Sequence, residues 1–312
     1  MIQYTQRLRI LYLTEPREDY LQDQILYGLR QLYGADVVDY PRKDVMYTGL
    51  GDGELYGRGF TLWRLLEDID IDRSQISERV TRGEFDRIIF GNVRRQRPLF
   101  WQMLRAGRFW GRSRGRFVFL DGQDGDRMFA ATAPFGPYFK REFGRRTLSR
   151  VKPISFSIPA VKVREDALPK TQLFGRHVQC EEAYKLPEVK QHCGSGYLFD
   201  REHDYYQDLA QSRYGITMKK GGWECMRHYE IAANHTVQAF YRLGDKPDRC
   251  APHGLKDMVN VVSFNTAEEL AQKIERIERE DRYESLQQNS VDWVRQHTCE
   301  AAASRLIEQT SA

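Results

Sequence analysis

The 312-residue sequence predicts an α/β protein built from two Rossmann-like, doubly wound domains that face a cleft. Short apolar runs alternate with amphipathic segments in both halves, which is typical of parallel sheets with helices on both faces. The alternation lapses between residues 145 and 170, which include three prolines, and then resumes. The length also suits two domains of roughly 100–200 residues better than one small core.

The amino-terminal domain is expected over residues 1–150, and its elements can be followed in order. The predicted strands are 7–16, 35–41, 85–92 and 116–122, and the predicted helices are 18–34, 74–84 and 100–110. Leu21, Ile25 and Leu29 recur at helical spacing in the first helix, and Gly34 is a stop signal. Ligands of such sheets sit beyond the carboxyl ends of the strands. Here those ends carry Thr14, Asn92 and the stretch from Asp121 to Asp124.

The carboxyl-terminal domain is expected over residues 151–312, with a last helix that could pack back on the first domain. Its predicted strands are 215–219, 236–243 and 259–264, and its predicted helices are 203–214, 225–234, 265–280, 283–298 and 300–309. Thr266 and Glu269 have the spacing of a capping box, and Leu270, Ile274 and Ile277 share one helix face.

Composition limits the class of protein. With 41% hydrophobic and 29% charged residues, the chain resembles a folded soluble protein. It has neither an apolar stretch of about 20 residues that would span a bilayer nor a signal-peptide pattern at its start. The five cysteines are scattered without a CxxC pair, so they support neither a disulfide framework nor a zinc site. We therefore expect a cytoplasmic, reduced protein.

Residues 218–230 combine two lysines, two glycines, an Arg-His pair and two glutamates immediately before an apolar run. A predicted strand leads into the two lysines and two glycines, and a helix is expected to begin near Trp223 or Glu224. Glycines at such a turn let a ligand approach the backbone, and the first helical turn attracts anions. Together with Arg227, these features predict a diphosphate site, although the chain lacks a P-loop motif. The alternative is an ordinary glycine turn with solvated lysines.

Residues 203–243 and 250–274 resemble the carboxyl-terminal nucleotide-sugar domain of GT-B glycosyltransferases, especially the CgeB-like branch. Tyr205, Asp208 and Ser212 match a helix of that family, and the segment from Arg227 to Glu230 matches its next helix. The resemblance covers about residues 200–300. It implies that Glu230 holds the ribose of a sugar nucleotide and that the preceding loop and helix start hold its diphosphate. The chain departs from the family at Asn234-His235, where many members have glycine.

The predicted function is therefore transfer of a sugar from a nucleotide sugar, which is a co-substrate, with no further cofactor. His228 and His253 lie near the site in sequence, and a structural histidine is the alternative for each. The predicted donor-binding residues are Lys219, Lys220, Gly221, Gly222, Arg227, His228, Glu230 and His253.

The amino-terminal half of the chain is expected to bind the acceptor and to supply the groups that activate it. In an inverting enzyme a base takes the proton of the acceptor hydroxyl, and we expect Asp121 or Asp124 in that role. Three aspartates, with Asp126 as the third, could instead hold Mg²⁺; we favour a metal-independent enzyme because cationic groups can counter the diphosphate. A polar turn is the plain alternative. The glycine-rich residues 48–68 predict either a mobile acceptor-side loop or a long solvated connection.

The acceptor itself is not specified, and a glycan, a lipid-linked molecule or another small molecule would fit. From Arg94 to Arg116 the chain has eight arginines, no acid and interleaved aromatic residues. This stretch predicts either peripheral contact with anionic membrane lipid or a solvated helix face. No stable nucleic-acid partner is expected. The rival function is a non-catalytic nucleic-acid- or membrane-binding protein on an α/β scaffold.

Overall fold

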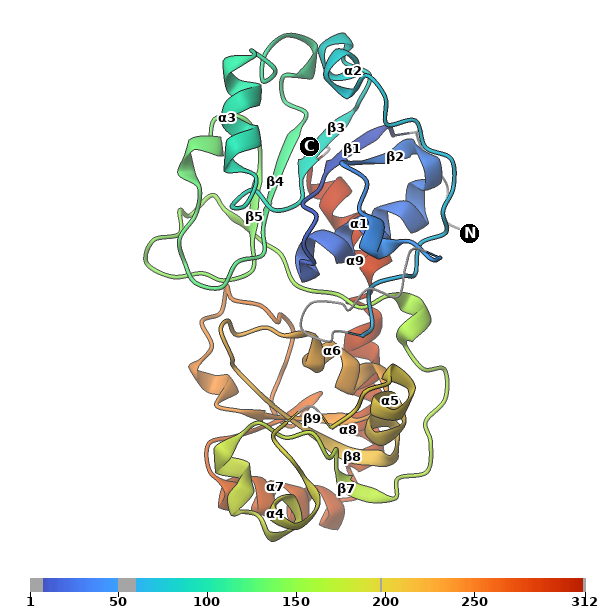
Figure 1. The fold of residues 1–312 in the computed structure, drawn as a ribbon. Coiled ribbons are helices and arrows are strands. Elements are labelled where there is room, and N and C mark those ends of the chain that lie inside the picture. The colour runs from blue at the N-terminus through green and yellow to red at the C-terminus, as the bar shows by residue number, and fades with distance from the viewer. Residues whose placement is uncertain (1–7, 50–59, 197, 311–312) are drawn as a thin grey trace. The chain divides into compact units, whose positions relative to one another are not determined.

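The computed structural model describes residues 8–49, 60–196 and 198–310. They belong to two compact units, one formed by residues 1–155 with 299–312 and the other by residues 156–298. Figure 1 shows that each unit combines a sheet with helices. Every strand pairing within the two sheets is parallel.

Unit 1 contains a six-stranded sheet with the order β2-β1-β3-β4-β5-β6. Its strands are β1 (Ile10–Leu13), β2 (Val37–Tyr40), β3 (Arg87–Phe90), β4 (Phe117–Asp121), β5 (Tyr138–Lys140) and β6 (Lys152–Pro153), and its helices are α1 (Tyr20–Tyr33), α2 (Ile76–Arg82), α3 (Arg97–Arg105) and α9 (Cys299–Thr310). The chain moves one way along the sheet from β1 to β2 and the other way from β3 to β4. Since such crossovers are right-handed, the connecting helices cover opposite faces. The carboxyl ends of β1 and β3 consequently flank a switch point, where open α/β sheets bind ligands.

Helix α9 belongs to unit 1 because it packs closely on α1 (Figure 1). Gly28, in the middle of α1, makes this approach possible. A Cβ atom at that position would lie 2.0 Å from the carbonyl oxygen of Cys299 and 2.9 Å from the Cβ of Ala303. Any side chain at position 28 would therefore push the two helices apart.

Unit 2 contains a four-stranded sheet with the order β10-β9-β8-β7. Its strands are β7 (Gln172–Phe174), β8 (Ser212–Met218), β9 (Val237–Tyr241) and β10 (Val261–Phe264), and its helices are α4 (Pro187–His192), α5 (Glu202–Gln211), α6 (Met226–Ala233), α7 (Ala267–Arg279) and α8 (Tyr283–Arg295). Tyr214 and Ile216 of β8 pack with Leu270 and Ile277 of α7 in one buried core cluster. Both units are thus α/β layers with parallel sheets, as the sequence predicts.

Two boundaries differ from the expected ones. The helix predicted over 100–110 spans Arg97–Arg105 instead, because Gly107, at a φ of +69°, turns the chain out of the helical conformation. The helix expected to begin near Trp223 or Glu224 begins at Met226, after an extended Cys225.

Candidate functional site

The start of helix α6 is held firmly against strand β8. Thr217 Oγ1 lies 3.0 Å from Nδ1 of His228, and the Nε2 of His228 donates to the backbone oxygen of Trp223 at 3.1 Å. A Cβ at Gly215 would lie 2.7 Å from Ile231, so α6 packs directly on this strand. His228 is fully buried with both ring nitrogens engaged. It therefore supports the segment between β8 and α6, and direct contact of His228 with a ligand is not favoured.

Two cations in this segment, Lys220 and Arg227, lie close enough for their charges to interact. Burial, and next the charge of Arg227, lowers the pKa of Lys220. Among the described residues, neither Lys220 nor Arg227 forms an ion pair. Like charges held near one another repel, and an anion bound between them would relieve that repulsion.

The loop that carries Lys220 is tightly turned. The backbone N–H of Lys220 donates to the oxygen of Gly222 at 3.0 Å, while Gly221 is exposed. Lys219 points elsewhere, with its Nζ 4.8 Å from the centre of the Trp223 ring. The turn therefore presents Lys220 and Gly221 at the carboxyl end of β8, ahead of the first turn of α6.

Glu230 stands one turn into α6 and is almost buried. Tyr205 of α5 donates its hydroxyl to Glu230 Oε2 at 3.0 Å. Burial, and next the charge of Glu230, raises the pKa of Tyr205 well above its usual value, so the tyrosine stays a hydrogen-bond donor. The pair fixes the direction of the Glu230 carboxylate.

The neighbouring strand β7 adds two residues that the sequence reasoning missed. Asp208 of α5 accepts from the backbone N–H of Arg176 at 2.9 Å and from its Nε at 2.7 Å. Burial, followed by the charges of Arg227 and Lys220, lowers the pKa of His177 to about 4, which places His177 beside these two cations. The signal was a short apolar strand followed by Gly-Arg-His, which lies just beyond the expected connection at residues 145–170.

These contacts also explain the helix motif noted in the sequence. Tyr205 holds Glu230, Asp208 holds Arg176, and Ser212 Oγ receives a hydrogen bond of 2.7 Å from Gln172 of β7. Tyr205 thus ties α5 to α6, Asp208 ties α5 to the segment after β7, and Ser212 joins the first residues of β7 and β8. His253 has other contacts, since its backbone oxygen accepts from Trp293 at 2.8 Å and burial lowers its pKa to about 4.

The aspartates at the end of β4 and directly after it have different environments. Asp121 is fully buried; its Oδ2 accepts from Tyr138 at 2.7 Å and from Lys140 Nζ at 3.1 Å, and its Oδ1 accepts from Gln123 N at 3.1 Å. The Asp124 side chain is 51% exposed and pairs with Arg141. Asp126 accepts from the backbone of Arg146. Along the described ranges, no group of three or more His, Cys, Asp or Glu residues is placed to hold a metal ion.

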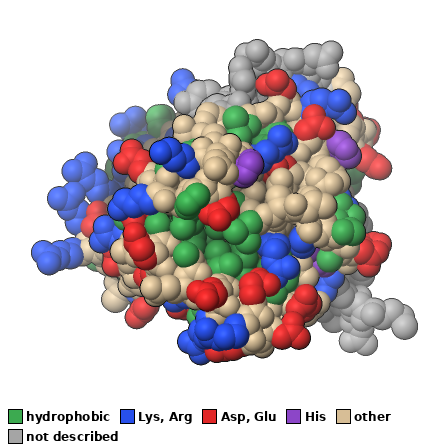
Figure 2. Space-filling view, turned by 90° about the horizontal axis from the view of Figure 1, so that it is seen from below, with side chains coloured by type: hydrophobic (Ala, Val, Ile, Leu, Met, Phe, Trp, Pro, Cys, Tyr) green, Lys and Arg blue, Asp and Glu red, His purple; other side chains and the backbone are tan. Residues whose placement is uncertain are grey.

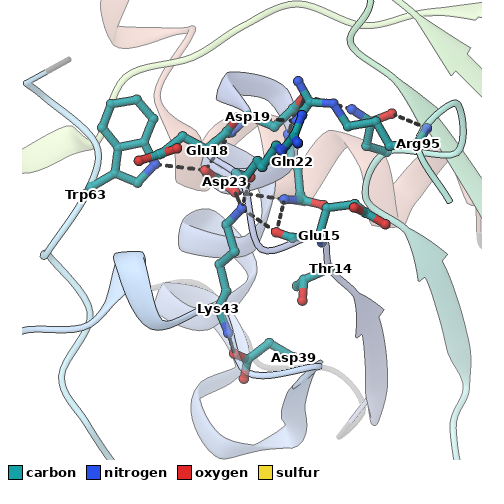
Figure 3. Close-up of polar contacts among 12 residues, drawn as sticks. Thr14, Glu15, Glu18, Asp19, Gln22, Asp23, Asp39, Lys43, Trp63 and Arg95 are labelled. Carbon is teal, nitrogen blue, oxygen red and sulfur yellow. Dashed lines mark hydrogen bonds and ion pairs between the residues drawn. The ribbon is translucent and has the colours of Figure 1, made fainter. Parts of the chain in front are cut away.

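A buried polar network fixes the segment that follows β1 (Figure 3). Lys43 and Asp23 form an ion pair of 3.2 Å with fully buried side chains, and Lys43 Nζ also donates to the backbone oxygen of Glu15 at 2.5 Å. Trp63 Nε1 donates to Asp23 at 2.8 Å. Nearby, Asn92 after β3 donates to the Asp19 carboxylate at 2.7 Å. The network organises the switch point of unit 1, and the glycine-rich residues 50–59 lie outside the described residues.

The arginine stretch is only partly solvated. Arg116 donates to the backbone oxygens of Gly83 and Phe85 at 2.8 and 2.6 Å, and Arg108 donates to Ser77 Oγ at 2.9 Å. Trp101 and Trp110 are 42% and 53% exposed. Arg108 and Arg116 therefore bind other parts of the protein, whereas Trp101 and Trp110 are exposed side chains that could contact a membrane.

Two general surface properties bear on rival functions. On the face shown in Figure 2, Lys and Arg side chains are mixed with Asp and Glu around a group of hydrophobic side chains, so this face carries no field of one sign. In the described part of the chain, every helix is too short or too polar to cross a membrane.

Comparison with known proteins connects this geometry to a fold class. Neither the protein-family models nor the curated proteins give a match. The structure is similar to that of Anabaena HepE in complex with UDP, at a TM-score of 0.56 and 8% identity over 97% of this chain and 100% of that chain. The structure of HepE in complex with UDP-glucose is similar at a TM-score of 0.52 and 11% identity, over 97% of this chain and 99% of that chain.

A glycosyltransferase from Rickettsia africae is also similar, with a TM-score of 0.54 and 9% identity over 97% of both chains. Likeness at such low identity concerns the fold. The prediction of two Rossmann-like units with parallel sheets is confirmed, and the chain has the GT-B fold.

Proposed function

We propose that the protein is a glycosyltransferase that takes its sugar from a nucleotide-sugar donor bound in unit 2. The observation that carries this proposal is the pair Lys220 and Arg227, two neighbouring cations that have no ion-pair partner among the described residues and that adjoin the start of α6. A diphosphate is the ligand that best suits such a site, because it brings two to three negative charges to cations and helix N–H groups together.

The chemistry follows from that placement. The bond between the anomeric carbon and the diphosphate oxygen breaks while the acceptor oxygen forms a new bond to that carbon. Lys220 and Arg227 stabilise the charge that develops on the departing diphosphate. We propose that these cations make a metal ion unnecessary.

The ribose lies against Glu230 in this proposal. A carboxylate can accept hydrogen bonds from two adjacent hydroxyls, and Tyr205 holds one of its oxygens at 3.0 Å, which fixes its orientation. Uridine is the first base to test, since the similar HepE structures contain UDP and UDP-glucose. His228 holds the loop in place through its contacts with Thr217 and the backbone of Trp223. Gly221 and Gly222 let the diphosphate approach the backbone.

The acceptor is assigned to unit 1. Between the two predicted bases we favour Asp124, because it is half exposed, whereas both Asp121 oxygens are engaged by Tyr138, Lys140 and Gln123. A lipid-linked acceptor would suit the exposed Trp101 and Trp110, although a soluble glycan suits the same chemistry. The CgeB-like branch and the cytoplasmic location stay predictions.

The test is isothermal titration calorimetry with UDP, GDP, ADP and CMP at one ionic strength. A transferase should clearly prefer one of these four nucleotides over the others. If no nucleotide binds while oligonucleotides or anionic vesicles do, the protein is the non-catalytic binding protein of the rival reading.

A further inference from the structure

Helix α3 presents a basic and aromatic stripe at the periphery of unit 1 (Figure 1). The helix turns Phe100 and Met103 inward, where both are buried. Arg97, Trp101 and Arg105 follow one another at intervals of four residues and are all exposed. Residues four apart lie above one another on the same face of a helix. The outer face of α3 therefore carries one indole between two guanidinium groups.

Trp110, in the turn that follows α3, belongs to the same surface. The ring centre of Phe100 lies 5.2 Å from that of Phe129 and 5.8 Å from that of Phe135. Trp101 packs edge-to-face with Phe129 at 5.9 Å, and Trp110 packs edge-to-face with Phe135 at 5.8 Å. Both indoles are therefore supported by a single aromatic cluster, although both remain well exposed.

The charges that accompany the two indoles in the sequence are all positive. Arg97, Arg105, Arg112 and Arg114 are exposed. Within the described ranges none of these four arginines forms an ion pair. Residues 93–120 contain no acidic side chain that could neutralise them. The arginines are therefore available to an anionic partner.

The adjoining helix α2 brings acidic groups toward this surface but does not neutralise it. Arg112 donates to the backbone oxygen of Arg82 at 3.4 Å, so the two segments are in contact. Glu84, just beyond α2, pairs with Arg79 and Arg82. Glu78 is the exposed acid of α2, and one carboxylate beside four arginines leaves the surface positive.

We propose that this surface docks unit 1 on an anionic membrane. The docking face consists of four arginines and two tryptophans: Arg97, Trp101, Arg105, Trp110, Arg112 and Arg114. Lipid phosphates pair with the guanidinium groups, and the indoles enter the headgroup region, where tryptophan is favoured. Docking needs no nucleotide, so it stands apart from the proposed transfer reaction.

The apolar centre of the docking face favours a membrane over a nucleic acid. Leu104, which lies beside Trp101 on α3, is partly exposed, as are Phe129 and Phe135. A bilayer gains from such a centre, because these side chains leave water together with the tryptophans. A nucleic acid would pair with the arginines and stack on the indoles, but it would leave Leu104 in water.

The first experiment measures cosedimentation of the full chain with phosphatidylcholine vesicles that contain graded amounts of phosphatidylglycerol. Binding should rise steeply with the anionic fraction and fall as salt is added, because salt screens the arginines. Binding that does not depend on the anionic fraction would overturn the proposal. Single- and double-stranded oligonucleotides are titrated at the same ionic strength, and a preference for them over the vesicles would also overturn it.

The second experiment separates the docking face from net charge. Arg97→Gln with Arg105→Gln should weaken vesicle binding about 25-fold, since each basic residue near an anionic surface contributes about fivefold. The control Lys256→Gln with Arg279→Gln removes the same charge from exposed positions of unit 2 and should change vesicle binding little. Equal losses in the two double variants would show that net charge alone matters and would refute a defined docking face.

The third experiment tests whether the indoles enter the bilayer. Brominated acyl chains quench tryptophan fluorescence at contact, so the native protein should lose fluorescence on anionic vesicles of brominated lipid. Trp101→Phe with Trp110→Phe should resist this quenching, because Trp63, Trp223 and Trp293 lie outside the docking face. Circular dichroism checks that the variant keeps its fold. Native protein that binds the vesicles without quenching, or equal quenching in the variant, would overturn the proposal.

Discussion

Replacing Arg227 by alanine tests whether this arginine binds a ligand or stabilises the fold. Arg227 has no ion-pair partner among the described residues, so its removal leaves no buried acid uncompensated, and the free energy of unfolding should change little. The substitution also relieves the repulsion that lowers the pKa of Lys220. The expected effect is therefore on the ligand and not on the fold.

The magnitude follows from the bond that would be lost. A hydrogen bond between a guanidinium and a phosphate oxygen is worth about 1.5–3 kcal/mol. Since 1.4 kcal/mol corresponds to a factor of ten, UDP should bind about 10- to 150-fold more weakly to Arg227→Ala. Uridine, which lacks the diphosphate, should bind as it does to the native protein. Arg227→Lys should retain part of the affinity.

Calorimetric titration with UDP and uridine measures both numbers on the same protein preparation. Arg201→Ala is a matched control, because the Arg201 side chain is 74% exposed and lies 3.8 Å from Asp204 on the protein surface. It should leave both affinities unchanged. If Arg227→Ala weakens UDP and uridine equally, or if it unfolds the protein, Arg227 is a structural residue and the reasoning fails.

Four further outcomes are expected. Glu230→Ala should weaken UDP and uridine alike by calorimetry, since both contain the ribose; loss for UDP alone would move Glu230 to the diphosphate side. Transfer activity should survive EDTA, and loss that Mg²⁺ reverses would contradict a metal-independent mechanism. Lys43→Met should lower the free energy of unfolding in urea by about 3–5 kcal/mol, because Asp23 would stay buried without its partner; a change below about 1 kcal/mol would show that the pair contributes little. The double substitution Arg105→Gln and Arg114→Gln should reduce sedimentation with anionic vesicles if the arginine stretch contacts membrane, and vesicle binding that stays the same would assign these side chains to the solvent.

The strands and helices that alternate strongly in the sequence are present in the structure. The segments 35–41 and 236–243 contain β2 and β9, and the segment 265–280 contains α7 with the predicted Thr266 cap, whose side chain accepts from Glu269 N at 3.2 Å. Short strands were not predictable. β5, β6 and β7 have only two or three residues each, so they carry no periodicity, and their pairing comes from the strands beside them.

In the candidate site, too, features that are local in sequence could be predicted, whereas contacts between distant segments could not. Local charge and glycine content predict a site in the segment around Lys220 and Arg227, because these features lie close together in sequence. His177 and the partnership of Tyr205 with Glu230 depend on which strands and helices become neighbours, and that information is not local. Asp121 was predicted as a base because it lies at the end of a strand, whereas β5 supplies the Tyr138 and Lys140 that engage it.

Hydrogen–deuterium exchange with and without UDP tests the central claim most directly, because it reports where the nucleotide binds without requiring an acceptor. The account predicts slower exchange in residues 219–230 and, more weakly, at Arg176 and His177, with the peptides of unit 1 unchanged by UDP alone. Protection confined to unit 1, or UDP binding that leaves residues 219–230 unprotected, would contradict a nucleotide site at the start of α6.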